Sequence, residues 1–187
     1  HLMVGSEGTL GYFTKIKLKL STLPSKKVMG LCHFPSFYES MDAAQYLVKL
    51  NPVSVELVDN TMIKLAKNIQ IFKKTVEKFI VGNPASLLIV EFSEKNDLEN
   101  EKKLRKLENI FIELGYNWNN PSKKGGIIKI FDSDDQSKIT EMRKSGLNIM
   151  MSMKTDSKPV SFVEDCAVNL ENLAEYTDGL KKILSLL

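Results

Sequence analysis

Four consecutive apolar residues, Leu87–Val90, lie near the middle of the chain, between a Gly-Asn-Pro turn and a long stretch rich in glutamate and lysine. A short apolar run bounded by turn residues is typical of a strand that is covered on both faces. We therefore predict a central strand over 86–92. A chain with such a strand must supply other elements to cover it, which restricts the fold to layered architectures.

The rest of the chain alternates between strand patterns and helix patterns. Further strands are predicted over 14–20, where lysines alternate with apolar residues, and over 28–34, 53–58, 127–131 and 159–168. Helix starts are indicated by the capping residues Ser36, Asp59, Ser133 and Asn169, and a helix over 97–114 is expected to stop at Gly115. This order predicts an α+β fold, with a ferredoxin-like antiparallel or mixed sheet and helices packed mainly on one face.

Length and charge narrow the class of protein. A chain of 187 residues with 43% hydrophobic residues can bury one substantial core, so we expect one main domain. The net charge is only +3 and lysines are mixed with glutamates, which argues against a dedicated nucleic-acid binder. No apolar run approaches the roughly 20 residues of a membrane span. Cys32 and Cys166 lack the spacing of a metal site and are expected to be buried, and His33 is expected to be a satisfied core side chain.

The segment at the start of the chain carries the clearest functional motif. Gly5, Gly8 and Gly11 recur every three residues, which lets a backbone turn tightly and approach a ligand closely. Exposed backbone amides can hold phosphate oxygens, and Ser6 and Thr9 add hydroxyl groups. No Gly-Lys-Ser/Thr follows, so the motif is not a Walker loop, and it leads into an alternating stretch rather than a helix, unlike a Rossmann fingerprint. Spacing alone leaves a phosphate cradle and a turn without function equally open.

The segment Val4–Gly11 resembles the closing segment of the FAD-binding domain in FAD-linked oxidases of the vanillyl-alcohol-oxidase type. That family includes glycolate oxidase subunits, D-lactate dehydrogenases and D-2-hydroxyglutarate dehydrogenases. Four later blocks resemble the family in the same order, over 52–59, 87–92, 142–147 and 162–168. The resemblance implies that residues 1–22 end a truncated FAD-binding domain. It also implies that residues 23–187 form the C-terminal substrate or cap domain, incomplete at its C-terminal end.

The resemblance also assigns candidate site residues. It implies that Arg143 holds the substrate carboxylate, although residue patterns alone favour a surface arginine paired with Glu141 or another neighbour. Glu164 and Asp165 are candidates for lining the active site, with a structural salt bridge as the alternative. The segment implied to contact FAD comprises Gly5, Ser6, Glu7, Gly8, Thr9, Leu10 and Gly11.

The family's catalytic and metal-binding histidines belong to a later block, and the chain ends before it, at Leu187. We therefore expect no catalytic residue and no metal ligand in this chain, and no activity from it alone. The implied whole protein is a cytoplasmic enzyme or one bound to the inner membrane face. It uses FAD to oxidise a 2-hydroxy acid such as D-lactate, glycolate or D-2-hydroxyglutarate. Its electron acceptor is separate or a downstream iron–sulfur segment, as in the long bacterial members. The alternative is a ferredoxin-like module that binds a small molecule without catalysis.

Overall fold

The computed structural model of the chain describes residues 2–20, 26–151, 163 and 166–186. Four strands and seven α-helices are found in these residues, together with two short 3₁₀ helices. In chain order they are β1 (Val28–Phe34), α1 (Phe37–Leu47), η1 (Val48–Leu50), β2 (Ser54–Asp59), α2 (Asn60–Lys67), α3 (Gln70–Phe79), β3 (Ser86–Phe92), α4 (Asp97–Glu113), β4 (Gly126–Ile130), α5 (Ser133–Lys144), α6 (Gly146–Met151), η2 (Leu170–Asn172) and α7 (Leu173–Leu184).

The four strands form one sheet in the order β2-β3-β1-β4, and all three pairings are antiparallel. Strand β1 is central: Leu31 lies opposite Ile89 of β3 on one side and Ile128 of β4 on the other. The order, with α1 between β1 and β2 and α4 between β3 and β4, is the ferredoxin-like arrangement expected from the sequence. The pair α2 and α3 is an addition between β2 and β3.

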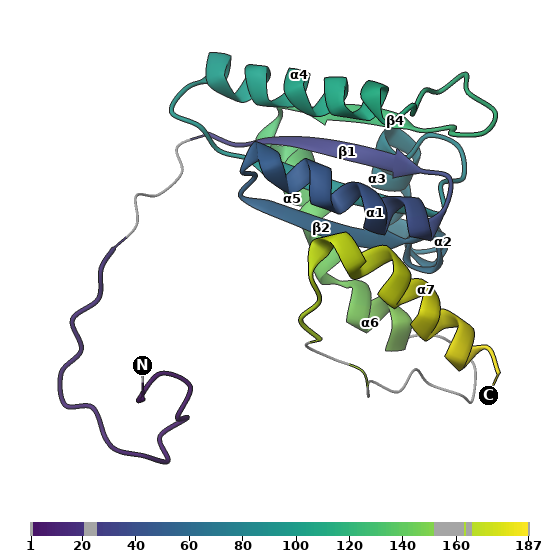
Figure 1. Cartoon of the computed structure of the whole chain (residues 1–187). Coiled ribbons are helices and arrows are strands. Elements are labelled where there is room, and N and C mark those ends of the chain that lie inside the picture. Colours follow the sequence, from purple (N-terminus) through teal and green to yellow (C-terminus); the bar gives the residue numbers. More distant parts are fainter. Residues whose placement is uncertain (1, 21–25, 152–162, 164–165, 187) are drawn as a thin grey trace.

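Helices cover both faces of the sheet (Figure 1). On one face, Val28, Cys32 and Phe34 of β1 pack in a core with residues of α1, α4 and α7. On the other face, Met29 and Leu31 pack with residues of α2, α3 and α5. Every residue of β1 is buried, as is nearly all of β3, so the predicted central strand with two covered faces is confirmed. Helices α1 and α4, which connect β1 to β2 and β3 to β4, do share one face of the sheet. The helix layer on the other face is larger than the sequence indicated.

Close packing explains the glycine at the centre of β1. A Cβ added to Gly30 would lie 2.5 Å from Cδ2 of Leu107, a fully buried side chain of α4. Real Cβ atoms essentially never approach another atom this closely, so a side chain at this position would require the Leu107 side chain to shift, and glycine lets α4 pack against the sheet without that shift.

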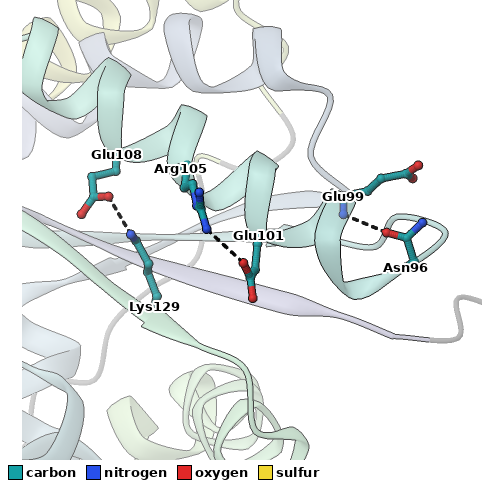
Figure 2. Close-up of polar contacts among 6 residues, drawn as sticks. All are labelled: Asn96, Glu99, Glu101, Arg105, Glu108 and Lys129. Atoms are coloured by element: carbon teal, nitrogen blue, oxygen red, sulfur yellow. Dashed lines mark hydrogen bonds and ion pairs between the residues drawn. The ribbon is translucent and has the colours of Figure 1, made fainter.

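Most helix boundaries follow the capping residues. The Ser36 hydroxyl accepts a hydrogen bond from the Glu39 backbone N–H, which is the first bond of a capping box, and donates to the Glu39 carboxylate, which in a full capping box would accept from the Ser36 backbone N–H. Asp59 caps α2, and Gly115 ends α4 with a φ of +87°. Asn96 caps α4 through the N–H of Glu99, as Figure 2 shows.

Three local predictions differ from the structure. Helix α5 is capped by Asp132, whose carboxylate accepts from the Asp135 N–H, and not by Ser133. The cap predicted at Asn169 is wrong, because its side chain makes no capping bond and η2 precedes α7. Cys32 is buried as expected, but Cys166 is exposed.

The strand predicted over 14–20 is also wrong. These residues form no strand and no ladder, and Ile16, Leu18 and Leu20 are exposed. Alternation of apolar and polar residues suits a strand with one face against a core. A strand forms, however, only when a neighbouring strand pairs with its backbone N–H and C=O groups. The described part of the chain offers residues 14–20 no such neighbour. Most of the strand predicted over 159–168 lies outside the described residues, and residues 166–168, which are described, form no strand.

Candidate functional site

The glycine segment folds into two consecutive tight turns. The backbone N–H of Ser6 donates to the Met3 carbonyl at 3.3 Å, and the N–H of Thr9 donates to the Ser6 carbonyl at 2.9 Å. Gly5 and Gly8 have φ values of +81° and +79°, a region that only glycine enters without strain. A Cβ at either position would meet no atom within 4 Å, so the backbone conformation, and not crowding, accounts for these two glycines.

The two hydroxyl groups of the turns differ in their hydrogen bonding. The side-chain oxygen of Ser6 is buried and has no hydrogen-bond partner among the described residues. The Thr9 hydroxyl donates to the Ser6 carbonyl at 2.6 Å and so stiffens the second turn. Leu10 beside it is 60% exposed.

Arg143 lies in the last turn of α5, and its side chain is 45% exposed. Its guanidinium Nη2 forms an ion pair with Oε2 of Glu56, a residue in the middle of β2 whose side chain is 37% exposed. The pair joins a helix to an edge strand that lies far from it in sequence. The local partner considered from the sequence, Glu141, does not take this role.

Helix α5, which carries Arg143, is anchored at its other end by Gln136. The Gln136 side chain is buried, and its Nε2 donates to the carbonyls of Lys27 at 2.9 Å and of Phe131 at 3.1 Å. These carbonyls lie just before β1 and just after β4, so one amide joins the helix to both strands. Gln136 and Arg143 are seven residues apart and therefore share one side of α5.

A second contact holds the same helix to α3. The Lys78 ammonium lies 2.7 Å from the Asp135 carboxylate. This hydrogen bond holds the pKa of the Asp135 carboxyl below its ordinary value. The position of Arg143 is thus set by the packing and polar contacts of the whole helix.

A cleft lies beside α5. It has a volume of about 1440 Å³, and Lys27, Glu91 and Lys144 are among its lining residues, whereas Arg143 is not. Lys27 and Glu91 are paired with each other at 2.7 Å. A second ion pair in the lining joins Lys26 to Asp97 at 2.5 Å, so four of the lining charges are paired with one another.

The structure brings some predicted site residues together and leaves others apart. No hydrogen bond or ion pair in the described parts of the chain joins residues 5–11 to Arg143, and in Figure 1 the glycine segment extends away from the helices. Glu164 and Asp165 lie outside the described residues. Residues 2–20, 26–151, 163 and 166–186 contain no group of three His, Cys, Asp or Glu side chains placed to hold a metal ion.

The site residue that sequence reasoning missed is Glu56. Its position in a strand of alternating pattern predicts which face of the sheet it occupies, but not which helix crosses that face. The only signal available was a lone acidic residue between Val55 and Leu57.

Residues 23–185 match the model of a protein family described as FAD linked oxidases, C-terminal domain. The chain is 29% identical over 186 residues to a D-2-hydroxyglutarate dehydrogenase of Haemophilus influenzae, a match that covers 98% of the chain and 18% of that relative. It is 28% identical over 187 residues to a mitochondrial D-lactate dehydrogenase (cytochrome) of Arabidopsis thaliana, covering 98% of the chain and 29% of the relative.

A third relative is the glycolate oxidase subunit GlcD of Bacillus subtilis. It is 27% identical over 193 residues, with 97% of the chain and 35% of the relative covered. The chain therefore spans only about a fifth to about a third of the curated relatives that it matches. No helix in the described residues combines the length and the apolar character that crossing a membrane requires.

Proposed function

Since the chain belongs to the FAD-linked oxidases and supplies their C-terminal domain, we propose that it is the substrate-side part of a flavoenzyme that oxidises a 2-hydroxy acid. The family match over residues 23–185 is the observation that carries this proposal. The three relatives described above are named for D-2-hydroxyglutarate, D-lactate and glycolate, which all carry a hydroxyl group next to a carboxylate. We place the end of a flavin-binding domain in residues 1–22 and the substrate domain in residues 23–187.

FAD, when bound, supplies the redox chemistry by accepting hydride from the carbon that bears the substrate hydroxyl. In this chain the candidates to hold it are the turned backbone of residues 5–11 and the Ser6 hydroxyl. The positive φ of Gly5 and Gly8 and the unpartnered Ser6 oxygen are compatible with that role. The catalytic base and any iron–sulfur segment belong, in this proposal, to parts of the protein beyond residue 187. A cytoplasmic location, with or without attachment to a membrane face, is part of the same proposal.

Arg143 is the candidate for holding the substrate carboxylate. A guanidinium can donate two parallel hydrogen bonds to one carboxylate, which fixes its orientation as well as its charge. The exposure of the Arg143 side chain leaves it accessible to a ligand. A small-molecule binding module without catalysis, the alternative drawn from the sequence, would not account for the family match.

The test uses the full-length gene product. We expect it to be purified with a flavin absorption band and to reduce a dye acceptor in the presence of a D-2-hydroxy acid. Arg143→Lys should raise the KM for the acid by about 10- to 100-fold while kcat falls much less, because a lysine keeps the charge but loses the paired geometry.

The matched control is Arg105→Lys. Arg105 lies on α4, with its side chain 71% exposed, and is paired with Glu101 at 3.2 Å in the same helix (Figure 2). This substitution should leave KM unchanged. A colourless full-length protein would refute the enzymatic proposal, and equal KM values for Arg143→Lys and wild type would remove Arg143 from the site.

A further inference from the structure

The ion pair between Glu56 and Arg143 joins two elements that are each held in place. Glu56 lies opposite Ile89 in the ladder between β2 and β3, so its backbone is fixed by the sheet. Arg143 lies on α5, which is anchored to β1 and β4 by the Gln136 amide and to α3 by the pair of Lys78 and Asp135. The contact therefore connects two rigid supports.

A long side chain at the end of such a helix needs a partner if it is to point in one direction. Arginine has many rotamers, and a binding site that must first order its arginine loses affinity for its ligand. Among the described residues, the Arg143 guanidinium forms an ion pair with Glu56. Glu56 is thus the group that orders it before a ligand arrives.

We propose that Glu56 is a positioning residue for Arg143 and aims its remaining donors at the substrate carboxylate. The inference rests on the proposed role of Arg143. A guanidinium has five N–H donors and one carboxylate engages at most two of them, so a second carboxylate can bind while the first stays in place. The exposed fractions of 45% for Arg143 and 37% for Glu56 show that the pair has an open side. A ligand can reach the guanidinium without breaking the pair.

The experiment measures KM and kcat of the full-length enzyme for its 2-hydroxy acid in five forms: wild type, Glu56→Ala, Glu56→Gln, Arg143→Ala and the double alanine variant. We expect Glu56→Ala to raise KM by about tenfold with kcat changed by less than about threefold, as expected for loss of a residue that supports a ligand-binding group. Glu56→Gln should restore most of the affinity, because its amide oxygen still accepts the hydrogen bond. In the Arg143→Ala background, removal of Glu56 should have no further effect on KM.

The matched control is Glu108→Ala. Glu108 of α4 pairs with Lys129 of edge strand β4 at 2.6 Å, so it is also a helix-to-edge-strand ion pair (Figure 2). Its loss should leave KM unchanged, and thermal unfolding of all variants shows whether each is folded.

The outcomes separate the inference from the function on which it rests. If Arg143→Ala leaves KM unchanged, the proposed role of Arg143 fails. If Arg143→Ala raises KM and Glu56→Ala does not, the positioning role alone fails. A lower KM in Glu56→Ala would overturn the inference as well, because Glu56 would then compete with the substrate.

Discussion

His33 shows how a polar residue is accommodated in the core of this domain. Its side chain is 1% exposed and lies edge-on to the ring of Trp118, with 5.2 Å between the ring centroids. Its Nδ1 lies 3.0 Å from the carbonyl of Leu31 and its Nε2 lies 3.2 Å from the backbone N of Val81. Since Val81 N–H can only donate, Nε2 accepts, and Nδ1 carries the proton and donates to Leu31. The prediction of a satisfied core histidine is confirmed.

Burial makes the stability of the domain depend on pH near neutrality. Desolvation lowers the pKa of His33 from its ordinary value of 6.5, against smaller opposing effects of its backbone hydrogen bonds. Below pH 6.5 the unfolded chain binds a proton at this position that the folded chain does not bind. The free energy of unfolding should therefore fall by up to about 1.4 kcal/mol per pH unit until the lowered pKa of the folded state is reached.

Urea denaturation at several values between about pH 7.5 and pH 5 checks this expectation. His33→Gln removes the titrating group and should flatten the dependence in that range. The lowered pKa values of the Asp135 and Glu175 carboxyls belong to a more acidic range, so they do not mask the effect. An equally steep dependence in His33→Gln would contradict the assignment to this residue.

The candidate site was only partly predictable from single residues. The spacing of Gly5 and Gly8 predicts backbone that needs glycine, and their positive φ values agree with it. Arg143 could be named only because its surroundings resemble a family block. Its partner Glu56 could not be named, because an ion pair between distant segments depends on which helix crosses which strand, and no local pattern contains that information.

Helices were the most predictable elements, because their caps are local. Ser36 and Asp59 accept hydrogen bonds from N–H groups three residues later, an interaction that depends on only a few consecutive residues. The predicted cap of α5 was wrong, because Asp132 and Ser133 are adjacent and both are residue types that cap helices. The carboxylate of Asp132 takes the role in the structure.

This assignment is testable by comparing two neighbouring alanine variants. Asp132→Ala should lower the free energy of unfolding by about 1 kcal/mol, because the Asp135 N–H loses its acceptor at the start of the helix. Ser133→Ala should change it by less than about 0.5 kcal/mol, since Ser133 is already inside the helix. Chemical denaturation followed by circular dichroism measures both. A larger loss for Ser133→Ala than for Asp132→Ala would show that the helix begins one residue later than described.

The class of the whole molecule and the four strands of its sheet were predicted, but the strand expected over 14–20 is absent and the layers were predicted less well. The ferredoxin-like sheet follows from the order of elements. The full second layer of α2, α3 and α5 does not, because amphipathic helices show that they bury one side without showing which face of a sheet receives it. The apolar run of β3 did carry that information, since a strand that is apolar on both faces requires cover on both.

The described contacts also predict that the domain is stable without the glycine segment. Hydrogen bonds of residues 2–20 join only residues of the same segment, such as Met3 to Ser6 and Ser6 to Thr9. Deletion of residues 1–20 should therefore shift the thermal unfolding midpoint by less than about 2 °C.

Differential scanning calorimetry of the two chains measures this shift. As a control, deletion of residues 173–187 removes α7, whose Ala174 is buried in the core beside α1, and should lower the midpoint clearly. A large loss of stability after removal of residues 1–20 would mean that the segment packs on the domain.

The position of β1 at the middle of the sheet has a consequence for folding during synthesis. Synthesis delivers this strand first, yet its two neighbours β3 and β4 appear only after α1, β2, α2 and α3, and for β4 also after α4. Until then β1, which is apolar on both faces, has no strand to pair with its backbone groups. This condition favours association between nascent chains. The sheet therefore cannot assemble in chain order: β1 can pair only once β3 has emerged, and the sheet is complete only after β4.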